Sequence, residues 1–424
     1  MIPPYTAGGA TQSGLSTRRK GSLMPEAVSQ VLEGLEAASR WQQELYEDLH
    51  RHPELSFQES RTCGIITDRL EAMGYEAQQI GGGVVGVFAN GDGPTVLGRA
   101  DIDALPVTEA TGLPYSSQVE GAMHACGHDM HVAWGLGAAE LLAQHRQSWS
   151  GTYVALFQPA EEVGAGARAM VDDGLVDRVP RPTVCLAQHV LTAPESGHVA
   201  TTQGPVLSAA CSIRITVHGK GSHGSMPHLA IDPVVLASAI VGRLQTVVSR
   251  VLAPDEFGVV TVGSLQAGST ANIIPDHAVL LVNVRAYDAA VQTRIVEAVE
   301  RIVRGECAAA GSPQEPEFET YDSYPLTSND AAVTEAVTAA FKRHFGADRV
   351  EKMAPATASE DFSVIPDAFG VPYTYWATGG FLPGRELVGN HNPGFAPDPQ
   401  PTLRTGTEAQ VVAALAHLGE GTAT

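Results

Sequence analysis

Long apolar runs and positive charge are both scarce in this sequence. No stretch reaches the roughly 18 consecutive apolar residues that a transmembrane helix needs. Only 26 Lys and Arg stand against 47 Asp and Glu, which gives a formal net charge of −21. Because such an acidic surface repels nucleic acid and anionic lipid, we expect neither a membrane nor a nucleic acid as partner.

Cysteine is also rare, with five residues at irregular spacings. An odd number without a regular pattern argues against a disulfide framework and favours a reducing, cytoplasmic compartment. Cys63, Cys185, Cys211 and Cys307 lie in apolar surroundings, as buried small residues do. Cys126 differs from them because it is flanked by histidines.

The first 24 residues lack the apolar core of a secretory signal, although they carry Arg18, Arg19 and Lys20. Pro, Gly, Ser and Thr are abundant there. We expect residues 1–24 to form a flexible tail ahead of the folded protein.

The remaining chain alternates short apolar runs with helical patterns. Apolar runs at 84–89, 95–101, 152–158 and 183–190 are separated by helical segments, including one predicted from about His128 to Gln144. This alternation predicts an α/β fold with a mixed, largely parallel sheet covered by helices. A length of 424 residues also exceeds that of one ordinary domain.

The pattern changes near Pro205 and changes back after about residue 324. Alternating strands are predicted at 212–218, 258–265 and 278–287, with one long helix over about 232–251 and another over about 289–309. We therefore expect an α+β domain at 207–324, inserted between two parts of a catalytic domain at 25–206 and 325–424.

Five metal-binding side chains lie in short motifs scattered along the chain. The motifs are MHACGHDMH, QPAEE, QHV and NHNPGF, and they contain Cys126, His128, Glu162, His189 and His391. A thiolate, a carboxylate and three imidazoles suit zinc, manganese, cobalt or nickel. Five ligands are too many for one four-coordinate catalytic ion, so two divalent ions sharing a ligand are predicted. Each histidine alone would more often be an ordinary hydrogen-bonded residue.

Two features refine this set. Cys126 and His128 precede a predicted helix, whose dipole, together with a cation, would lower the thiol pKa; the alternative is a buried Cys with a capping His. Glu161 and Glu162 follow an apolar strand, where neighbouring side chains point to opposite faces. One can therefore bind metal while the other handles protons, unless the pair is a solvated acidic turn. His131, one helical turn after His128, is read as a packing residue, and His124 is left unassigned.

In order along the chain, the motifs resemble the aminoacylase and hippurate-hydrolase branch of the dinuclear-metal amidohydrolases, related to carboxypeptidase G and to IAA-amino acid hydrolases. Further motifs in the same order extend the resemblance over roughly residues 40 to 400: HPELSFQE (52–59), RADIDALP (99–106), GKGSHGSMPH (219–228), STANIIPD (269–276) and SEDF (359–362).

The resemblance implies a role for each matched residue. Glu161 is the general base and Glu162 the ligand. Asp103 is assigned from its position at the end of a predicted strand: it holds a ligand from outside the metal shell, and the alternative is a turn or helix cap. His223 reaches the active site of the partner subunit and stabilises the oxyanion, which makes the protein a homodimer through its inserted domain. Asn272 and Arg285 hold the carboxylate of the substrate, a task that suits the forked guanidinium of Arg.

The function implied is hydrolysis of the amide bond of N-acyl amino acids to a carboxylic acid and an amino acid. A dipeptidase or carboxypeptidase of the same superfamily is the nearest alternative. A hydrolase with Cys126 as nucleophile and a catalytically silent binding protein are the others. If Tyr375 and Trp376 line the acyl pocket, a bulky acyl group is favoured; a buried core strand explains both residues equally well.

Overall fold

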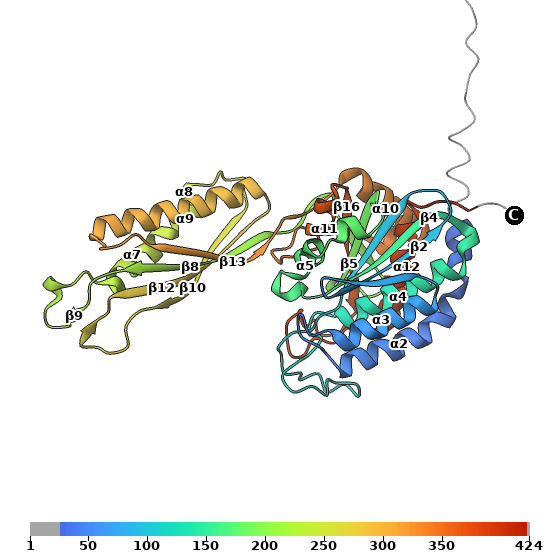
Figure 1. The fold of residues 1–424 in the computed structure, drawn as a ribbon, viewed down its shortest axis with the longest axis horizontal. Coiled ribbons are helices and arrows are strands. Elements are labelled where there is room, and N and C mark those ends of the chain that lie inside the picture. Colours follow the sequence, from blue (N-terminus) through green and yellow to red (C-terminus); the bar gives the residue numbers. More distant parts are fainter. Residues whose placement is uncertain (1–25, 422–424) are drawn as a thin grey trace, which may run out of the picture.

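The computed structural model describes residues 26–421. These residues form two lobes joined by a narrow connection (Figure 1). The tail predicted over residues 1–24 lies outside the described residues.

The larger lobe is built on a nine-stranded sheet in the order β1-β2-β4-β3-β5-β16-β6-β15, with β17 paired to β4. Its four central strands run parallel, while β1, β2 and β6 run antiparallel to their inner neighbours. The fold class predicted from the sequence is therefore correct. The strands are β1 (Glu76–Ile80), β2 (Gly83–Asn90), β3 (Thr95–Asp101), β4 (Trp149–Gln158), β5 (Val184–Glu195), β6 (Val199–Thr201), β15 (Val350–Lys352), β16 (Tyr373–Phe381) and β17 (Gly419–Glu420).

Helices cover both faces of this sheet, which explains why its central strands are apolar on both sides. Neighbouring residues of β3 point to opposite faces of the sheet: Val96 packs in one hydrophobic core and Leu97 in the other. The first core is completed by α2 (Leu35–Arg51), α3 (Ser60–Ala72), α4 (His128–Gln144), α10 (Ala331–Phe345) and α12 (Pro399–Leu415). The second is completed by α5 (Gly166–Asp172), α6 (Leu175–Arg178) and α11 (Val364–Phe369).

The smaller lobe has an antiparallel sheet of its own, in the order β10-β12-β8-β13, and a separate hydrophobic core. The strands of this lobe are β8 (Ala209–His218), β9 (Ser222–His223), β10 (Gly258–Gln266), β11 (Ile273–Ile274), β12 (His277–Ala286) and β13 (Glu317–Tyr324). Its helices are α7 (Pro233–Leu244), α8 (Thr246–Arg250) and α9 (Ala289–Ala310). The single helix expected over 232–251 is thus two helices, divided at Gln245. The exact domain boundaries stay a prediction.

The chain passes between the lobes twice, and the two passages lie side by side. On the way out β7 (Gly204–Leu207) pairs antiparallel with β14 (Thr327–Asn329), which lies on the way back. Short 3-10 turns complete the structure: η1 (Leu32–Gly34), η2 (Arg146–Ser148), η3 (Glu161–Val163), η4 (Pro227–Leu229) and η5 (Ala347–Arg349). Among the described residues, no helix is long and apolar enough to span a bilayer.

Candidate metal centre

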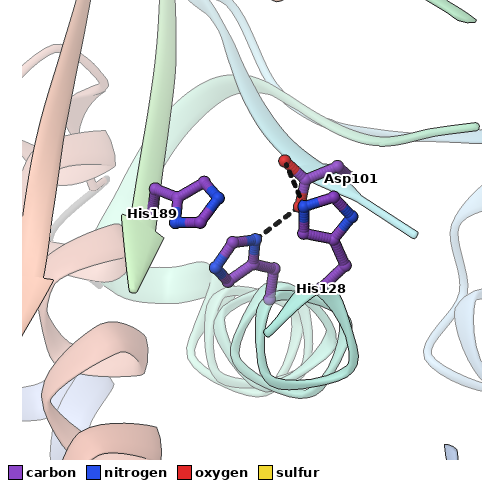
Figure 2. A group of neighbouring side chains, drawn as sticks. Asp101, His128 and His189 are labelled. Atoms are coloured by element: carbon purple, nitrogen blue, oxygen red, sulfur yellow. Dashed lines mark hydrogen bonds and ion pairs between the residues drawn. The ribbon is translucent and has the colours of Figure 1, made fainter. Parts of the chain in front are cut away.

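Several chemically active side chains meet at the carboxyl ends of the central strands, where α/β folds usually place their sites. Asp101 ends β3, His189 lies in β5, and His128 opens α4. Figure 2 shows these three side chains turned toward one another from three different elements. Glu161 and Glu162 reach the same region from η3, just after β4.

The structure brings together all five residues predicted as ligands. Cys126 Sγ lies 3.4 Å from His189 Nε2, and Glu162 Oε2 lies 3.2 Å from His391 Nε2. The second carboxylate oxygen of Glu162 is 3.8 Å from His128 Nε2. His391 lies after the smaller lobe in sequence and the other four lie before it, so the two outer segments of the chain meet here.

The free atoms of this cluster fit a metal ion. His128 Nε2 and Glu162 Oε1 are buried and have no hydrogen-bond partner among residues 26–421. The Nδ1 atoms of two histidine rings are held by the protein. His128 Nδ1 lies 3.2 Å from Asp103 Oδ1, and His189 Nδ1 lies 2.8 Å from the carbonyl oxygen of Val190. Held in this way, each imidazole turns its other nitrogen inward, as metal-binding histidines do.

The protein surroundings of Cys126 favour the neutral thiol. Burial raises the pKa of its thiol, and the negative charge of Glu162 raises it further, while hydrogen bonds to His128 and His391 oppose the shift. The expectation that the start of α4 and a cation together lower this pKa stays a prediction. A bound divalent cation would reverse the balance, because metal binding and thiol deprotonation are coupled.

Asp103 ties the predicted base and ligands together. Its Oδ2 accepts hydrogen bonds from Ser56 Oγ at 2.7 Å and from the backbone N–H of Glu162 at 3.1 Å. Although burial favours the protonated form, the hydrogen bonds of His128, Ser56 and Glu162 hold the pKa of Asp103 below its usual value. Asp103 thus contacts His128 and the backbone of Glu162, while its supporting role stays a prediction.

Glu161 is surrounded by other carboxylates. It is buried in η3, whose preceding residue Ala160 has a φ of 48°, and its carboxylate lies close to those of Glu360 and Asp361. Burial raises the pKa of Glu161 well above its usual value, and the charges of Glu360, Glu162 and Asp361 add to this rise. A carboxyl group with a raised pKa next to a candidate metal cluster suits proton transfer.

A buried ion-pair network beneath the site was not predicted from the sequence. The Arg99 guanidinium is fully buried and donates to Asp101 Oδ2 at 2.6 Å and to Glu360 Oε1 at 2.6 Å. Gln158 joins it by accepting from Arg99 Nε at 2.9 Å. RADIDALP contains Arg99 and Asp101, and SEDF contains Glu360, so these motifs were a signal, but which residues pair is decided by the fold.

One assignment made from the sequence changes, and one alternative left open there is decided. His131 is not simply a packing residue: it hydrogen-bonds Asp101, its Nε2 accepts from the backbone N–H of Val190 at 3.0 Å, and its ring stacks on Trp134. For Tyr375 and Trp376, the structure agrees with the alternative of a buried core strand, because one packs in each of the two hydrophobic cores beside β16.

The residues predicted from the smaller lobe do not reach the cluster within one chain. His223 is exposed, and its Nδ1 contacts Ser225 Oγ at 2.8 Å. It lies in β9, which Figure 1 shows at the end of the smaller lobe that points away from the larger one. Asn272 is exposed beside it, and the backbone carbonyl oxygen of Asn272 accepts a hydrogen bond from the backbone N–H of Gly224.

Arg285 lies at the opposite end of the smaller lobe. Its Nη1 donates to the carbonyl oxygen of Thr357 and, at 3.2 Å, to Oγ of Ser359, the residue directly before the buried Glu360. In this arrangement Arg285 joins the two lobes.

Comparison with known proteins places these observations in context. The family model described as peptidase family M20/M25/M40 matches residues 97–415. N-acetyl-L-cysteine deacetylase of Bacillus subtilis is 36% identical over 336 residues, which are 78% of this chain and 79% of the relative. Hippurate hydrolase of Campylobacter jejuni is 36% identical over 77% of this chain and 85% of the relative. The crystal structure of a dinuclear metal-binding M20 peptidase from Bacillus subtilis superposes with a TM-score of 0.76, at 31% identity, covering 90% of this chain and 98% of the other.

Proposed function

Since the chain belongs to peptidase family M20/M25/M40, we propose that it is a metal-dependent amidohydrolase that cleaves N-acyl amino acids to a carboxylic acid and an amino acid. The observation that carries the proposal is the cluster of one thiol, one carboxylate and three imidazoles, with Glu161 directly beside it. The relatives that hydrolyse N-acetylcysteine and hippurate support this substrate class.

We assign two divalent ions to each chain, held by Cys126, His128, Glu162, His189 and His391. Zinc, manganese, cobalt and nickel all suit these donors. When bound, such ions polarise an amide carbonyl and lower the pKa of a water molecule toward neutrality.

Glu161 moves the proton in this scheme. Its carboxylate accepts a proton from the attacking water, the oxygen of that water bonds to the carbonyl carbon, and the C–N bond then breaks. The proton held on Glu161 passes to the leaving nitrogen, which departs as the amine of the amino acid. Asp103 keeps His128 and the N–H of Glu162 in place throughout.

The remaining roles require a second chain or a movement of the smaller lobe. We assign His223 of a partner subunit to the oxyanion, because it lies on the exposed end of the smaller lobe. Asn272 and Arg285 are assigned to the carboxylate of the substrate. The outer strands β10 and β13 leave sheet edges that a homodimer can use. We also place the enzyme in the cytoplasm, since all five cysteines are unpaired and buried.

The test combines metal analysis with a substrate panel. Protein purified without chelator should hold about two equivalents of divalent metal and hydrolyse some of the N-acetyl, N-benzoyl or long-chain N-acyl amino acids. Chelation should abolish turnover, and added metal should restore it. Turnover that survives metal removal but not thiol alkylation would instead support Cys126 as nucleophile. A requirement for a free amino group on the acyl side would indicate a dipeptidase.

A further inference from the structure

The return passage from the smaller lobe brings one side chain against the turn that carries both glutamates. Tyr324 is the last residue of β13, and its hydroxyl donates to the backbone carbonyl of Glu162 at 3.1 Å. Its ring lies over Gly164, where an added Cβ would come within 2.8 Å of the ring carbon Cζ. The contact therefore has two parts, a hydrogen bond and a ring that only glycine leaves room for.

A β-bulge directs Tyr324 to this place. Tyr321 pairs with Ser212 and Tyr324 pairs with Ala210, so β13 contains one residue more than β8 over this interval. Asp322 lies within the bulge and has a φ of 47°. Because one extra residue reverses which face the following side chains occupy, the bulge decides that Tyr324 points to the catalytic turn.

The turn itself has an unusual backbone on both sides. Ala160 and Gly164, which flank η3, have φ angles of 48° and 63°, in the left-handed region. The backbone of the turn is tied to the larger lobe through Asp103, which accepts from Glu162 N–H, and through Glu59, which accepts from Ala160 N–H. The side chain of Glu162 adds its contact with His391. Tyr324 holds the turn from the other side and from the other lobe.

Building on the proposed function, we propose that Tyr324 is a positioning residue that fixes the Glu161–Val163 turn and makes its geometry depend on the seating of the smaller lobe. The hydroxyl holds the carbonyl of Glu162, and the ring confines Gly164. Glu161 and Glu162 then keep their separate directions only while the smaller lobe stays seated against the turn.

Tyr324→Phe tests the hydroxyl, and Tyr287→Phe is the matched control. The Tyr287 hydroxyl also joins the lobes, by donating to the carbonyl of Pro355 at 3.0 Å, but it does not touch the turn. We expect Tyr324→Phe to lower kcat by roughly 10- to 100-fold with little change in KM, since small displacements of catalytic groups cost this much. Tyr287→Phe should keep kcat, while both variants lose similar thermal stability.

Hydrogen exchange gives a readout that does not depend on activity. In metal-loaded protein, the amides of residues 161–166 should exchange faster in Tyr324→Phe than in the wild type and in Tyr287→Phe. A wild type without turnover on N-acyl amino acids would contradict the proposed function, and the exchange rates would still decide the role of Tyr324. Unchanged exchange in Tyr324→Phe, or equal loss of kcat in both variants, would overturn the positioning role.

Discussion

At the scale of single residues, Glu161 and Glu162 are neighbours in sequence with different surroundings. Glu162 contacts His128 and His391, whereas Glu161 lies among the carboxylates of Glu360 and Asp361. The 3-10 turn between Ala160 and Gly164 separates their directions. The extended chain assumed from the sequence would also separate them, but the structure does so by a turn.

This difference predicts opposite effects of two substitutions. Glu161→Gln should keep both metal ions and lower kcat by roughly 10²–10⁴, the usual size of a general acid–base contribution. Glu162→Ala should lose metal. Metal analysis and steady-state kinetics on the same preparations would check both effects, and reversed phenotypes would mean that the two roles are exchanged.

A second buried ionic group lies behind the start of α4. His50 Nδ1 is 2.6 Å from Asp129 Oδ2, and His50 Nε2 is 3.4 Å from Glu109 Oε1. Burial alone would lower the pKa of His50, but the hydrogen bonds to Asp129 and Glu109 outweigh it and raise this pKa to about 9. Burial raises the pKa of Glu109, but hydrogen bonds from His50, Thr111 and Ser117 outweigh this effect and lower the pKa to about 2.

This group predicts how stability depends on pH. The folded pKa of His50, about 9, exceeds its ordinary value of 6.5, so the stabilisation is complete below pH 6.5 and is lost as pH rises through about 9. The shift corresponds to an upper value of about 3 kcal/mol. Urea unfolding between pH 6 and 10 should show this decline in the wild type and a flatter profile in His50→Gln. Parallel profiles would contradict the assignment.

The residue types of the site could be predicted from the sequence, but most contacts between them could not. Short motifs were enough to predict that Cys126, His128, Glu162, His189 and His391 form one cluster, and the structure brings them together. The partners of Arg99 could not be predicted, because Glu360 is 261 residues away and only the folded sheet brings it near. His131, in α4, was misread for the same reason, since its partner Asp101 belongs to a strand that the fold brings against the helix.

At the scale of elements, the start of α4 depends on one glycine. Gly127 lies between Cys126 and His128 with a φ of 85°, and a Cβ there would lie 2.4 Å from Val190 Cγ1. Any larger residue must therefore adopt a strained backbone and displace β5 or the helix.

Gly127→Ala should lower the free energy of unfolding by about 1–3 kcal/mol and reduce metal content as well. Gly64→Ala is the control, because Gly64 lies within α3 and nothing approaches its Cβ position within 4 Å. That change should raise stability by roughly 0.5–1 kcal/mol. Chemical denaturation and metal analysis measure both; equal effects at the two glycines would contradict this account.

Elements with a strong periodic pattern could be predicted closely, and short edge strands could not. The helix expected over about 128–144 and the strand expected over 95–101 coincide with α4 and β3. The pattern gave no sign of β1 and β15, which lie at the edges of the large sheet. The residues of edge strands are partly exposed and lack a strong apolar pattern. Their pairing with neighbouring strands, more than their own sequence, makes them strands.

At the scale of the whole molecule, the sequence showed that the outer segments must meet, but not how the two lobes are placed. The lobes extend along one axis, with β9 at the far end (Figure 1). No local pattern encodes that separation, because the contacts of Arg285, Tyr287 and Tyr324 with the larger lobe set it.

Mixing two inactive variants tests whether chains share a site. His223→Ala should lower kcat by roughly 10²–10³ without releasing metal, the cost of one lost oxyanion donor. If His223 serves the partner, a heterodimer of His223→Ala and Glu161→Gln chains has one intact site of two. Random pairing of equal amounts should then restore about a quarter of wild-type activity. No recovery after subunit exchange, or full activity in a monomer, would refute sharing.

Because β9 lies far from the metal cluster of its own chain, the proposal makes catalysis depend on dimer formation and therefore on protein concentration. A chain whose oxyanion donor lies on the far end of its smaller lobe works only while paired, so activity per chain should fall on dilution below the dissociation constant of the pair. Metal ions would stay bound over the same range. The amount of protein in the cell would then set the activity of each molecule as well as the number of molecules.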